Sequence, residues 1–286
     1  MGKLHVAGGR DMIKYRSKMK RFIIYAVLIL GAVTMIVPFL WMISSSLKLD
    51  KDIFDFPIKW IPREPRWKNY QEAWSRAPFG IFYWNTIKIA VSVTVLQLLT
   101  CSLSAYSFAK LKFPGRDKIF LGYLATLMVP FQVIMIPQFL IIKKLGLHDT
   151  HTALILLAAF SPFGVFLLRQ FFISIPDELL EAARIDGLNE FGIYSKIVLP
   201  LSKPAIASLA IFTFVDRWND FLGPLIYLDS VKKKTIQLGI RLFQTQYGNE
   251  FSLIMAGAVC AVIPIIIVYV CAQKFFIEGI ALTGIK

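Results

Sequence analysis

The sequence predicts an all-α protein that crosses a membrane six times. Of its 286 residues, 56% are hydrophobic and only 17% are charged, whereas soluble domains average about 45–50% and about 25%. The mean hydropathy is also positive, at +0.61. In addition, several uncharged runs reach the length of about 20 residues that a helix needs to cross the hydrocarbon layer. Little of the chain remains for a separate soluble domain.

Six segments are predicted as spans. Four contain no Asp, Glu, Lys or Arg: residues 22–47, 89–109, 119–142 and 251–273. A shorter run, 152–168, ends at Arg169, whose guanidinium we expect to reach the membrane interface while its stem stays in lipid. The remaining segment, 204–228, is the fifth span in chain order and is interrupted midway by charged residues.

Orientation follows from the lysine and arginine distribution, because cytoplasmic loops are enriched in both. The basic segment 1–21 and the loop 110–118 are therefore placed inside the cell membrane, and an even number of spans puts both termini in the cytoplasm. The first run exceeds a signal-peptide core and serves as an uncleaved anchor. The chain divides into segment 1–21, a transmembrane domain 22–273 and a cytoplasmic tail 274–286. The net charge of +14 indicates loops and lipid headgroups rather than nucleic acid.

Between the fourth and fifth spans, residues 174–203 are too polar for lipid and predict a short helix. Pro176 suits a first helical turn, and Asp177 and Glu178 complement the positive end of the helix dipole. Gly187 is a natural stop.

One face of this helix is predicted to be apolar and small: Ile175, Leu179, Ala182 and Ala183. Paired alanines would let it fit closely into a groove of a partner, where Glu181 could meet a basic group. The periodicity equally allows the helix to lie against its own bundle or on the membrane surface.

The motif in this loop is Glu181-Ala182-Ala183, three residues, Gly187, nine residues, Ile197, one residue, then Leu199-Pro200. It resembles the EAA loop of ABC importer permeases at every defining position. The resemblance implies a coupling helix that docks into a cleft of an ATPase subunit, with those seven residues forming the contact.

Further segments resemble the carbohydrate-uptake branch, in particular the maltose-type second permease subunit. They are Met128-Val129-Pro130, Ile136-Pro137, Lys144 to Leu147, Ser161 to Gly164, Leu168 to Phe172, Leu199 to Ala205 and Trp218 to Leu225. The resemblance implies inward translocation of a sugar or oligosaccharide. It also implies a second permease, two ATPase subunits that hold ATP and Mg, and an extracytoplasmic solute-binding protein, with no cofactor in this chain. Asp216-Arg217 and the tail 279–286 depart from the family pattern.

The charges within span 204–228 allow two interpretations. Charged groups in a membrane usually face the bundle interior or a cavity, so Trp218, Asn219 and Asp220 are candidates for lining a translocation path. Alternatively, Asp216, Arg217 and Asp220 form an internal ion pair or a contact with the partner permease. In that case a kink is expected at Gly223-Pro224.

The loop 229–250 is predicted to lie outside. In similar permeases it contacts the solute-binding protein, which implies such a role for Gln237, Leu238 and Gly239. The basic cluster Lys232 to Lys234 would attract an acidic partner surface. A solvated loop is the alternative.

The sequence contains no Gly-x4-Gly-Lys-Ser/Thr phosphate loop, so ATP hydrolysis by this chain is not expected. His148 and His151 lack further metal ligands, and no metal site is predicted. Cys101, Cys260 and Cys271 lie in apolar runs and are expected to be structural thiols. Three other functions remain open: a permease for an amino acid, polyamine or glycerophosphate, a six-span membrane enzyme, and a transporter driven by ions through Asp216 and Asp220.

Overall fold

The computed structural model describes residues 5–245 and 248–283, with side chains described for 19–244 and 250–273. The all-α prediction is confirmed, since the strands within this part of the chain form one hairpin of two residues a side, β1 (Gln244–Thr245) and β2 (Gly248–Asn249). The helices are α1 (His5–Ser46), α2 (Asp50–Ile53), α3 (Lys68–Arg76), α4 (Phe79–Lys110), α5 (Arg116–Ala125), α6 (Phe131–Lys144), α7 (His151–Leu157), α8 (Pro162–Ile173), α9 (Asp177–Ile185), α10 (Glu190–Ile193), α11 (Leu199–Leu201), α12 (Lys203–Trp218), α13 (Leu222–Tyr227), α14 (Ile236–Arg241) and α15 (Phe251–Thr283).

Three described helical segments are long and apolar enough to cross a membrane: Met19–Ser46, Phe79–Lys110 and Phe251–Gln273. Three more candidates are helix pairs bent at a short break. They are Arg116–Met128 with Phe131–Lys144 at 97°, His151–Leu157 with Pro162–Ile173 at 43°, and Glu190–Leu201 with Lys203–Trp218 at 79°. The predicted total of six spans is reached when each bent pair is taken as one.

The fifth predicted span differs from its expected form. Helix α12 ends at Trp218, and a separate short helix, α13, follows at Leu222. The break therefore lies at residues 219–221, ahead of Gly223-Pro224, which was the expected position of the kink. The Asp220 carboxylate accepts the backbone N–H of Gly223 at 3.1 Å, which fixes the start of the second segment.

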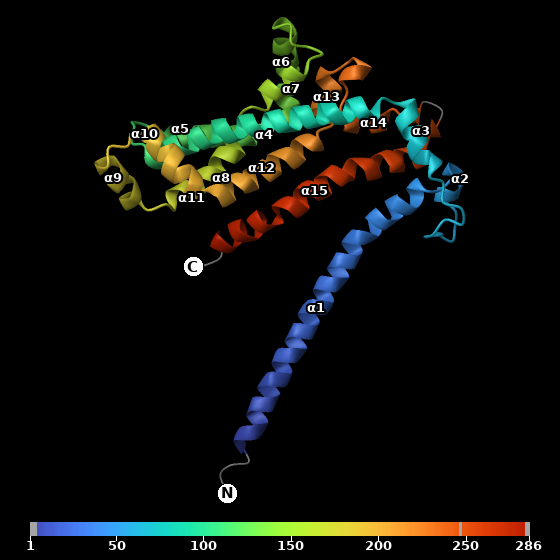
Figure 1. The fold of residues 1–286 in the computed structure, drawn as a ribbon, viewed down its shortest axis with the longest axis horizontal. Coiled ribbons are helices and arrows are strands. Elements are labelled where there is room, and N and C mark those ends of the chain that lie inside the picture. The colour runs from blue at the N-terminus through green and yellow to red at the C-terminus, as the bar shows by residue number, and fades with distance from the viewer. Residues whose placement is uncertain (1–4, 246–247, 284–286) are drawn as a thin grey trace.

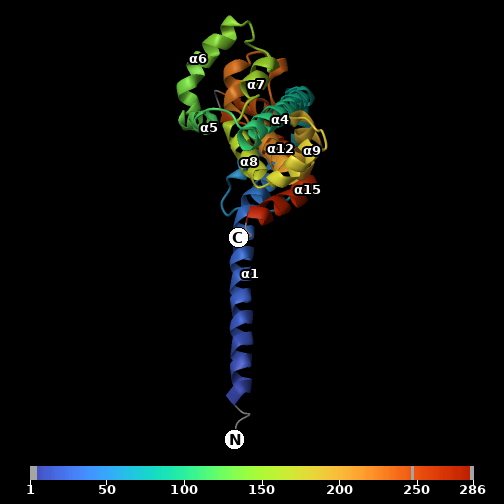
Figure 2. The same ribbon diagram turned by 90° about the vertical axis from the view of Figure 1, so that its left-hand side faces the viewer.

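Helices α4, α8, α12 and α15 form the centre of the bundle, in which α4 packs against α8 and α12, and α12 packs against α15. Figure 1 shows α9 and α10 at one end of the bundle and α2 and α3 at the other, here named the α9 end and the α3 end. Helix α1 contacts α15 near the α3 end and then diverges from the bundle, while α5 and α6 arch away on another side (Figures 1 and 2).

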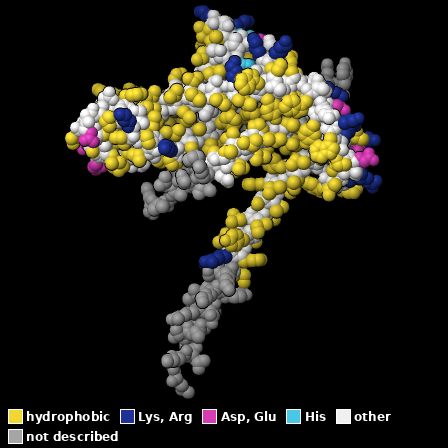
Figure 3. All heavy atoms as spheres, in the orientation of Figure 1, with side chains coloured by type: hydrophobic (Ala, Val, Ile, Leu, Met, Phe, Trp, Pro, Cys, Tyr) yellow, Lys and Arg dark blue, Asp and Glu magenta, His cyan; other side chains and the backbone are white. Residues whose placement is uncertain are grey.

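The surface of the long helices is apolar. Figure 3 shows hydrophobic side chains along the middle of the bundle, with charged side chains toward its ends and basic side chains on the projection formed by α6, α7 and α13. None of the most apolar stretch within the α1 span, Met19–Ser46, is buried inside the protein. An apolar exterior of this extent is stable in lipid but not in water.

Candidate functional site

Helix α9 carries the predicted coupling motif and has the expected ends. It begins directly after Pro176, with Asp177 and Glu178 in its first turn. Gly187 follows the helix with a φ of 85°, a left-handed conformation that favours glycine. Its N–H donates to the Arg184 carbonyl at 3.0 Å, and a Cβ there would meet nothing within 4 Å. Glycine is therefore required by backbone conformation rather than by space.

The residues of the predicted apolar face lie on two different sides of α9, one buried and one exposed. Leu180 and Ala183 are buried against the chain's own bundle, at 1% and 4% exposure. Leu179 is 47% exposed and Ile185 is 86% exposed, and Ala182 is exposed beside them. The expectation that Ile175, Leu179, Ala182 and Ala183 share one contact face is therefore wrong, because Ile175 and Ala183 are buried whereas Leu179 and Ala182 are exposed. One side of the helix is anchored to the bundle, and the side with Ala182 and Ile185 remains free.

An ion pair ties α9 to α4. The Lys110 ammonium donates to the Asp177 carboxylate at 2.6 Å and to the Ile175 carbonyl at 2.6 Å. The Lys110 side chain is only 4% exposed. Its hydrogen bond and charge hold the pKa of Asp177 below its usual value.

A second link joins α10 to α4 and to α9. The Glu190 carboxylate accepts the Tyr106 hydroxyl at 2.6 Å and the Arg184 guanidinium at 2.9 Å. Its hydrogen bond raises the pKa of Arg184. The neighbouring Tyr194 hydroxyl lies 2.8 Å from the Ser102 hydroxyl of α4. The whole motif region is thus fastened to one long helix.

The last part of the motif forms an unusual helical turn. Residues Tyr194–Val198 are π-helical and lead into α11, which contains Pro200. Proline cannot donate to the helix ladder, and a π-turn is one way in which a helix absorbs such an interruption. Ile197 and Leu199 pack against the core, while Pro200 is exposed.

Arg169, at the end of the predicted span 152–168, forms several contacts within the bundle. Its guanidinium lies 4.1 Å from the centroid of the Phe120 ring and donates to the Phe108 carbonyl at 3.1 Å. It also contacts Asp117 at 3.2 Å, and its side chain is 15% exposed. These contacts join α8 to α4 and α5.

A cavity of about 670 Å³ lies between α4, α6, α8, α12 and α13. Most of its wall is apolar, and its polar members are Gln97, Gln138, Ser161, Thr213, Asp216, Arg217, Asp220 and Tyr227. Gln97 is held by the Ala158 carbonyl at 2.7 Å and accepts the Thr213 hydroxyl at 2.9 Å. Spacing could not have revealed Gln97 or Gln138, because both lie in uncharged runs far from the motif.

The charged residues at and just after the end of α12 form the predicted ion pairs at the cavity wall. Arg217 donates to Asp220 at 3.4 Å and also contacts Asp216. The two interpretations of these charges are thus compatible, because the paired groups also line the cavity.

Trp218 is oriented differently from the path-lining prediction. It is 0% exposed and stacks against Phe214, and its indole N–H donates to the Ala261 carbonyl at 2.9 Å. It therefore faces α15 rather than the cavity. Asn219 is exposed and accepts a hydrogen bond from Gln237 at 3.3 Å. Of the three predicted residues, Asp220 alone is at the cavity wall.

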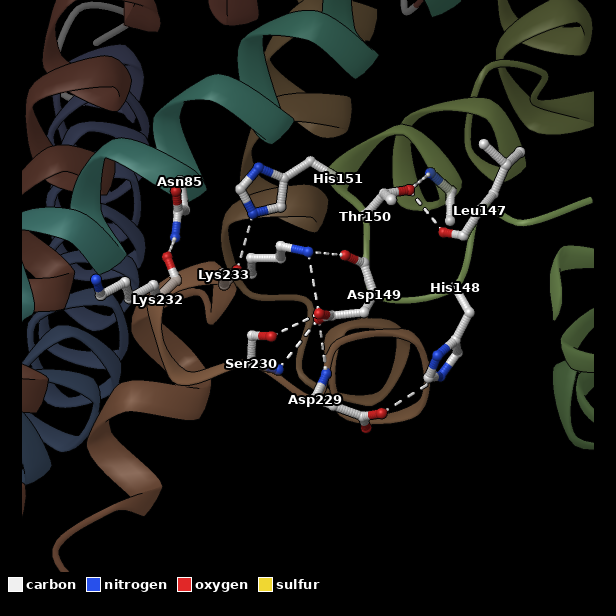
Figure 4. A network of polar contacts seen from close by, with 11 residues as sticks. Asn85, Leu147, His148, Asp149, Thr150, His151, Asp229, Ser230, Lys232 and Lys233 are labelled. Atoms are coloured by element: carbon white, nitrogen blue, oxygen red, sulfur yellow. Dashed lines mark hydrogen bonds and ion pairs between the residues drawn. The ribbon is translucent and has the colours of Figure 1, made fainter.

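Beside α7 and α13, which project from the bundle in Figure 1, a polar network joins two loops (Figure 4). Asp149, which has a φ of 56°, accepts hydrogen bonds from the backbone of Asp229 and Ser230 and from the Ser230 hydroxyl, at 3.0, 3.1 and 2.6 Å. Lys233 pairs with the same carboxylate at 3.0 Å. The Ser230 bonds and Lys233 hold the pKa of Asp149 well below its usual range.

The two histidines of this region take part in the same network. The His151 ring lies 2.8 Å from the Lys233 carbonyl, and His148 lies 3.8 Å from Asp229. Among the described residues, no group of three or more His, Cys, Asp or Glu side chains is arranged to hold a metal ion.

Helix α14 places the predicted binding-protein contacts largely inside the chain. Leu238 is 4% exposed, and Gly239 packs so closely that an added Cβ would lie 2.3 Å from the Phe82 ring. Both residues are therefore needed for packing and present no side chain to a partner. Gln237 is half-buried and bonded to Asn219.

Comparison with known proteins identifies the family. Residues 97–281 match the model of the binding-protein-dependent transport system inner membrane component. The arabinooligosaccharides transport system permease protein AraQ of Halalkalibacterium halodurans is 41% identical over 208 residues, which cover 71% of this chain and 75% of that protein. The sn-glycerol-3-phosphate transport system permease protein UgpE of Yersinia enterocolitica is 34% identical over 265 residues, covering 90% and 94%.

A solved structure has the same fold over nearly its whole length. It is a chain of a bacterial ABC transporter involved in the import of the acidic polysaccharide alginate. The TM-score is 0.80 at 27% identity, covering 91% of this chain and 98% of that one. The resemblance carried by the Glu181 motif is thus confirmed. The chain belongs to the binding-protein-dependent transport system inner membrane components, as a multi-pass membrane permease subunit that is not itself an enzyme.

Proposed function

We propose that this permease translocates a neutral sugar or oligosaccharide inward, and that ATP hydrolysis in separate subunits drives the transport. The observation that carries the proposal is the two-sided construction of α9, which is anchored through Leu180 and Ala183 and free along Ala182 and Ile185. A helix fixed to the bundle on one side can transmit the movement of a subunit docked on the other.

The assembly proposed for transport contains a second permease, two ATPase subunits and an extracytoplasmic binding protein. ATP and Mg would be bound by the ATPases, with no cofactor in this chain. The α9 end would face the cytoplasm, where Glu181, Ala182, Ala183 and Gly187, with Ile197, Leu199 and Pro200, form the coupling region. The α3 end would face outward, and Gln237 of α14 is its proposed contact with the binding protein. The basic segment at the start of α1 supports this orientation, with both termini inside.

The cavity near α12 is the proposed part of the translocation path in this subunit. Its apolar wall with a few amide, hydroxyl and carboxylate groups suits a sugar, which offers both hydroxyls and apolar ring faces. Asp216, Arg217 and Asp220 line it together, and two carboxylates with one guanidinium leave a net negative charge. This charge disfavours an anionic solute such as glycerophosphate, although the similarity to UgpE keeps that solute as an alternative. A polyamine is the other alternative solute.

Reconstitution in proteoliposomes tests the proposal. We expect uptake of neutral oligosaccharides only when the ATPases, ATP and the binding protein are all present, and less uptake of glycerol 3-phosphate or spermidine. Asp216→Asn is expected to change the KM for the sugar, whereas Asp55→Asn, far from the cavity, is expected to leave it unchanged. Uptake by this chain alone down an ion gradient would support an ion-coupled transporter instead.

A further inference from the structure

A second cavity, of about 580 Å³, lies at the α3 end between the end of α1, α2 and the segment that follows it. It is outside residues 97–281, which match the family model, and it shares no lining residue with the cavity of the proposed transport path. Its charged lining consists of Lys48, Lys59, Arg63 and Arg66 with Asp52 and Glu64. Four positive and two negative groups give a net charge of +2, so the cavity attracts anions.

Lys48 is the central residue of this cavity. It is 4% exposed, and its buried ammonium has no hydrogen-bond partner in the described part of the chain. Burial lowers the pKa of Lys48. A buried and unpartnered ammonium is costly unless a group from outside the chain completes it.

The cavity wall is held in place by hydrogen bonds. The Asn69 amide donates to the Lys48 carbonyl at 2.8 Å, and the Ser44 hydroxyl donates to the Trp60 carbonyl at 2.5 Å. The Arg66 N–H donates to the Leu47 carbonyl at 3.0 Å. The basic groups are therefore presented by a fixed surface rather than by a loose loop.

Two of the four cations already have carboxylate partners. Lys59 lies 3.6 Å from Asp55, and Arg66 lies 3.5 Å from Glu72. For Lys48 and Arg63, no ion pair is formed within the described residues. These two side chains have free donors for an incoming anion.

The position of the cavity indicates the source of that anion. Lys48 lies two residues after the candidate membrane span of α1, which runs from Met19 to Ser46. The adjoining loop exposes large apolar side chains, with Phe56 at 93%, Ile61 at 85% and Trp60 at 47%. Aromatic residues next to basic residues at the end of a span are typical of the membrane interface, where they meet lipid headgroups.

We propose that the cavity lined by Lys48 and Arg63 binds the phosphate of an anionic phospholipid headgroup at the α3 end of the bundle. The exposed aromatic side chains of the loop would lie among the neighbouring acyl chains and headgroups. The bound lipid would hold the end of α1, a spanning helix that diverges from the bundle, at a fixed place in the membrane. This site depends on the chain crossing a membrane but not on which solute it carries.

The test uses the assembled transporter in lipid nanodiscs, with Lys48→Met as the variant and Lys51→Met as its control. Lys51 lies on α2, is exposed and is outside the cavity lining. Native mass spectrometry would count phosphatidylglycerol molecules retained after mild delipidation. We expect retention to fall about fivefold or more in Lys48→Met, the effect of one basic residue at an anionic surface, and to stay unchanged in Lys51→Met.

Thermal unfolding separates lipid binding from a packing role. In phosphatidylcholine nanodiscs Lys48→Met is expected to be at least as stable as the unsubstituted chain, because it removes an unpartnered charge. Only the unsubstituted chain should gain stability in phosphatidylglycerol. Equal retention of phosphatidylglycerol by the unsubstituted protein and by Lys48→Met would overturn the proposal. So would stabilisation in phosphatidylcholine by inorganic phosphate alone, which indicates a site for free phosphate. A defect of Lys48→Met confined to binding of the solute-binding protein would also overturn it, in favour of a protein contact.

Discussion

Lys110, the last residue of α4, donates to Asp177, the first residue of α9, over 2.6 Å. The contact joins a helix that runs through the bundle to the helix that carries the coupling motif. Because the Lys110 side chain is almost fully buried, its position follows that of α4. A displacement of α9 is therefore transmitted to α4 through this contact, without an intervening flexible loop.

Weakening this contact is expected to reduce coupling without preventing assembly. In Asp177→Asn the carboxylate becomes a neutral amide while Lys110 keeps its bond to Ile175. Because Asp177 is largely exposed, the loss is about 0.5–1 kcal/mol, or about a two- to fivefold reduction in sugar transported per ATP. Transport and hydrolysis would be measured together in proteoliposomes. Glu178→Gln, which removes a charge from the same turn, is the control, and an equal effect in both variants would contradict the role of the ion pair.

The same contact predicts a pH dependence. Lys110 lowers the pKa of Asp177 from its ordinary value of 3.8, so the contact's contribution is fully present above that value. It is lost as the pH falls through the lowered pKa in the folded protein. Hydrogen exchange of α9, corrected for intrinsic rates, should stay constant from about pH 8 to about pH 5 and rise only in stronger acid. A rise in exchange near neutral pH would show that another group controls the helix.

Gly239 is expected to tolerate no side chain. A Cβ at this position would lie 2.3 Å from the Phe82 ring, which is fully buried. Gly239→Ala should therefore destabilise the permease by about 1–3 kcal/mol, the usual cost of overpacking. A melting curve in nanodiscs measures this loss. Gly80→Ala, where a Cβ meets nothing within 4 Å, provides the comparison, and equal melting temperatures would argue against tight packing of α14.

The network around Asp149 predicts a stability effect in the loops beside α7 and α13. An asparagine cannot accept all the bonds that the Asp149 carboxylate receives from Asp229, Ser230 and Lys233. We expect Asp149→Asn to cost about 1–3 kcal/mol and to increase exchange in the loop 228–236. Lys232→Met, which removes an exposed charge from the same loop, should change neither. A melting temperature for Asp149→Asn equal to that of the unsubstituted chain would mean that the network is dispensable.

Patterns within short segments predicted much of this structure. Apolar runs identified the spans, and the ends of α9 followed from Asp177, Glu178 and Gly187. Those features are local, because they depend on hydropathy, helix dipole and backbone conformation. Periodicity could not decide which residues of α9 are buried. It placed Leu179 on the contact face, whereas tertiary packing uses Leu180 and Ala183.

The remaining site residues depend on contacts between distant parts of the chain. Lys110 meets Asp177 across 67 positions and Thr213 meets Gln97 across 116, and no sequence spacing announces either pair. Trp218 lies next to charged residues in the sequence, which favoured a role in the path. Adjacent side chains point about 100° apart around an α-helix. The Trp218 ring is therefore directed toward α15, where the Ala261 carbonyl accepts its indole N–H. Neighbours in sequence thus face different surroundings on α12.

The central claim is that the exposed side of α9 docks into an ATPase subunit, and cysteine crosslinking in native membranes tests it most directly. Ala182→Cys places a thiol on the free side, and Ala183→Cys places one on the side buried against the bundle. We predict that a short bifunctional reagent captures a nucleotide-hydrolysing subunit through Ala182→Cys and much less of it through Ala183→Cys. If neither cysteine captured such a subunit in transport-competent membranes, the coupling role of α9 would be contradicted.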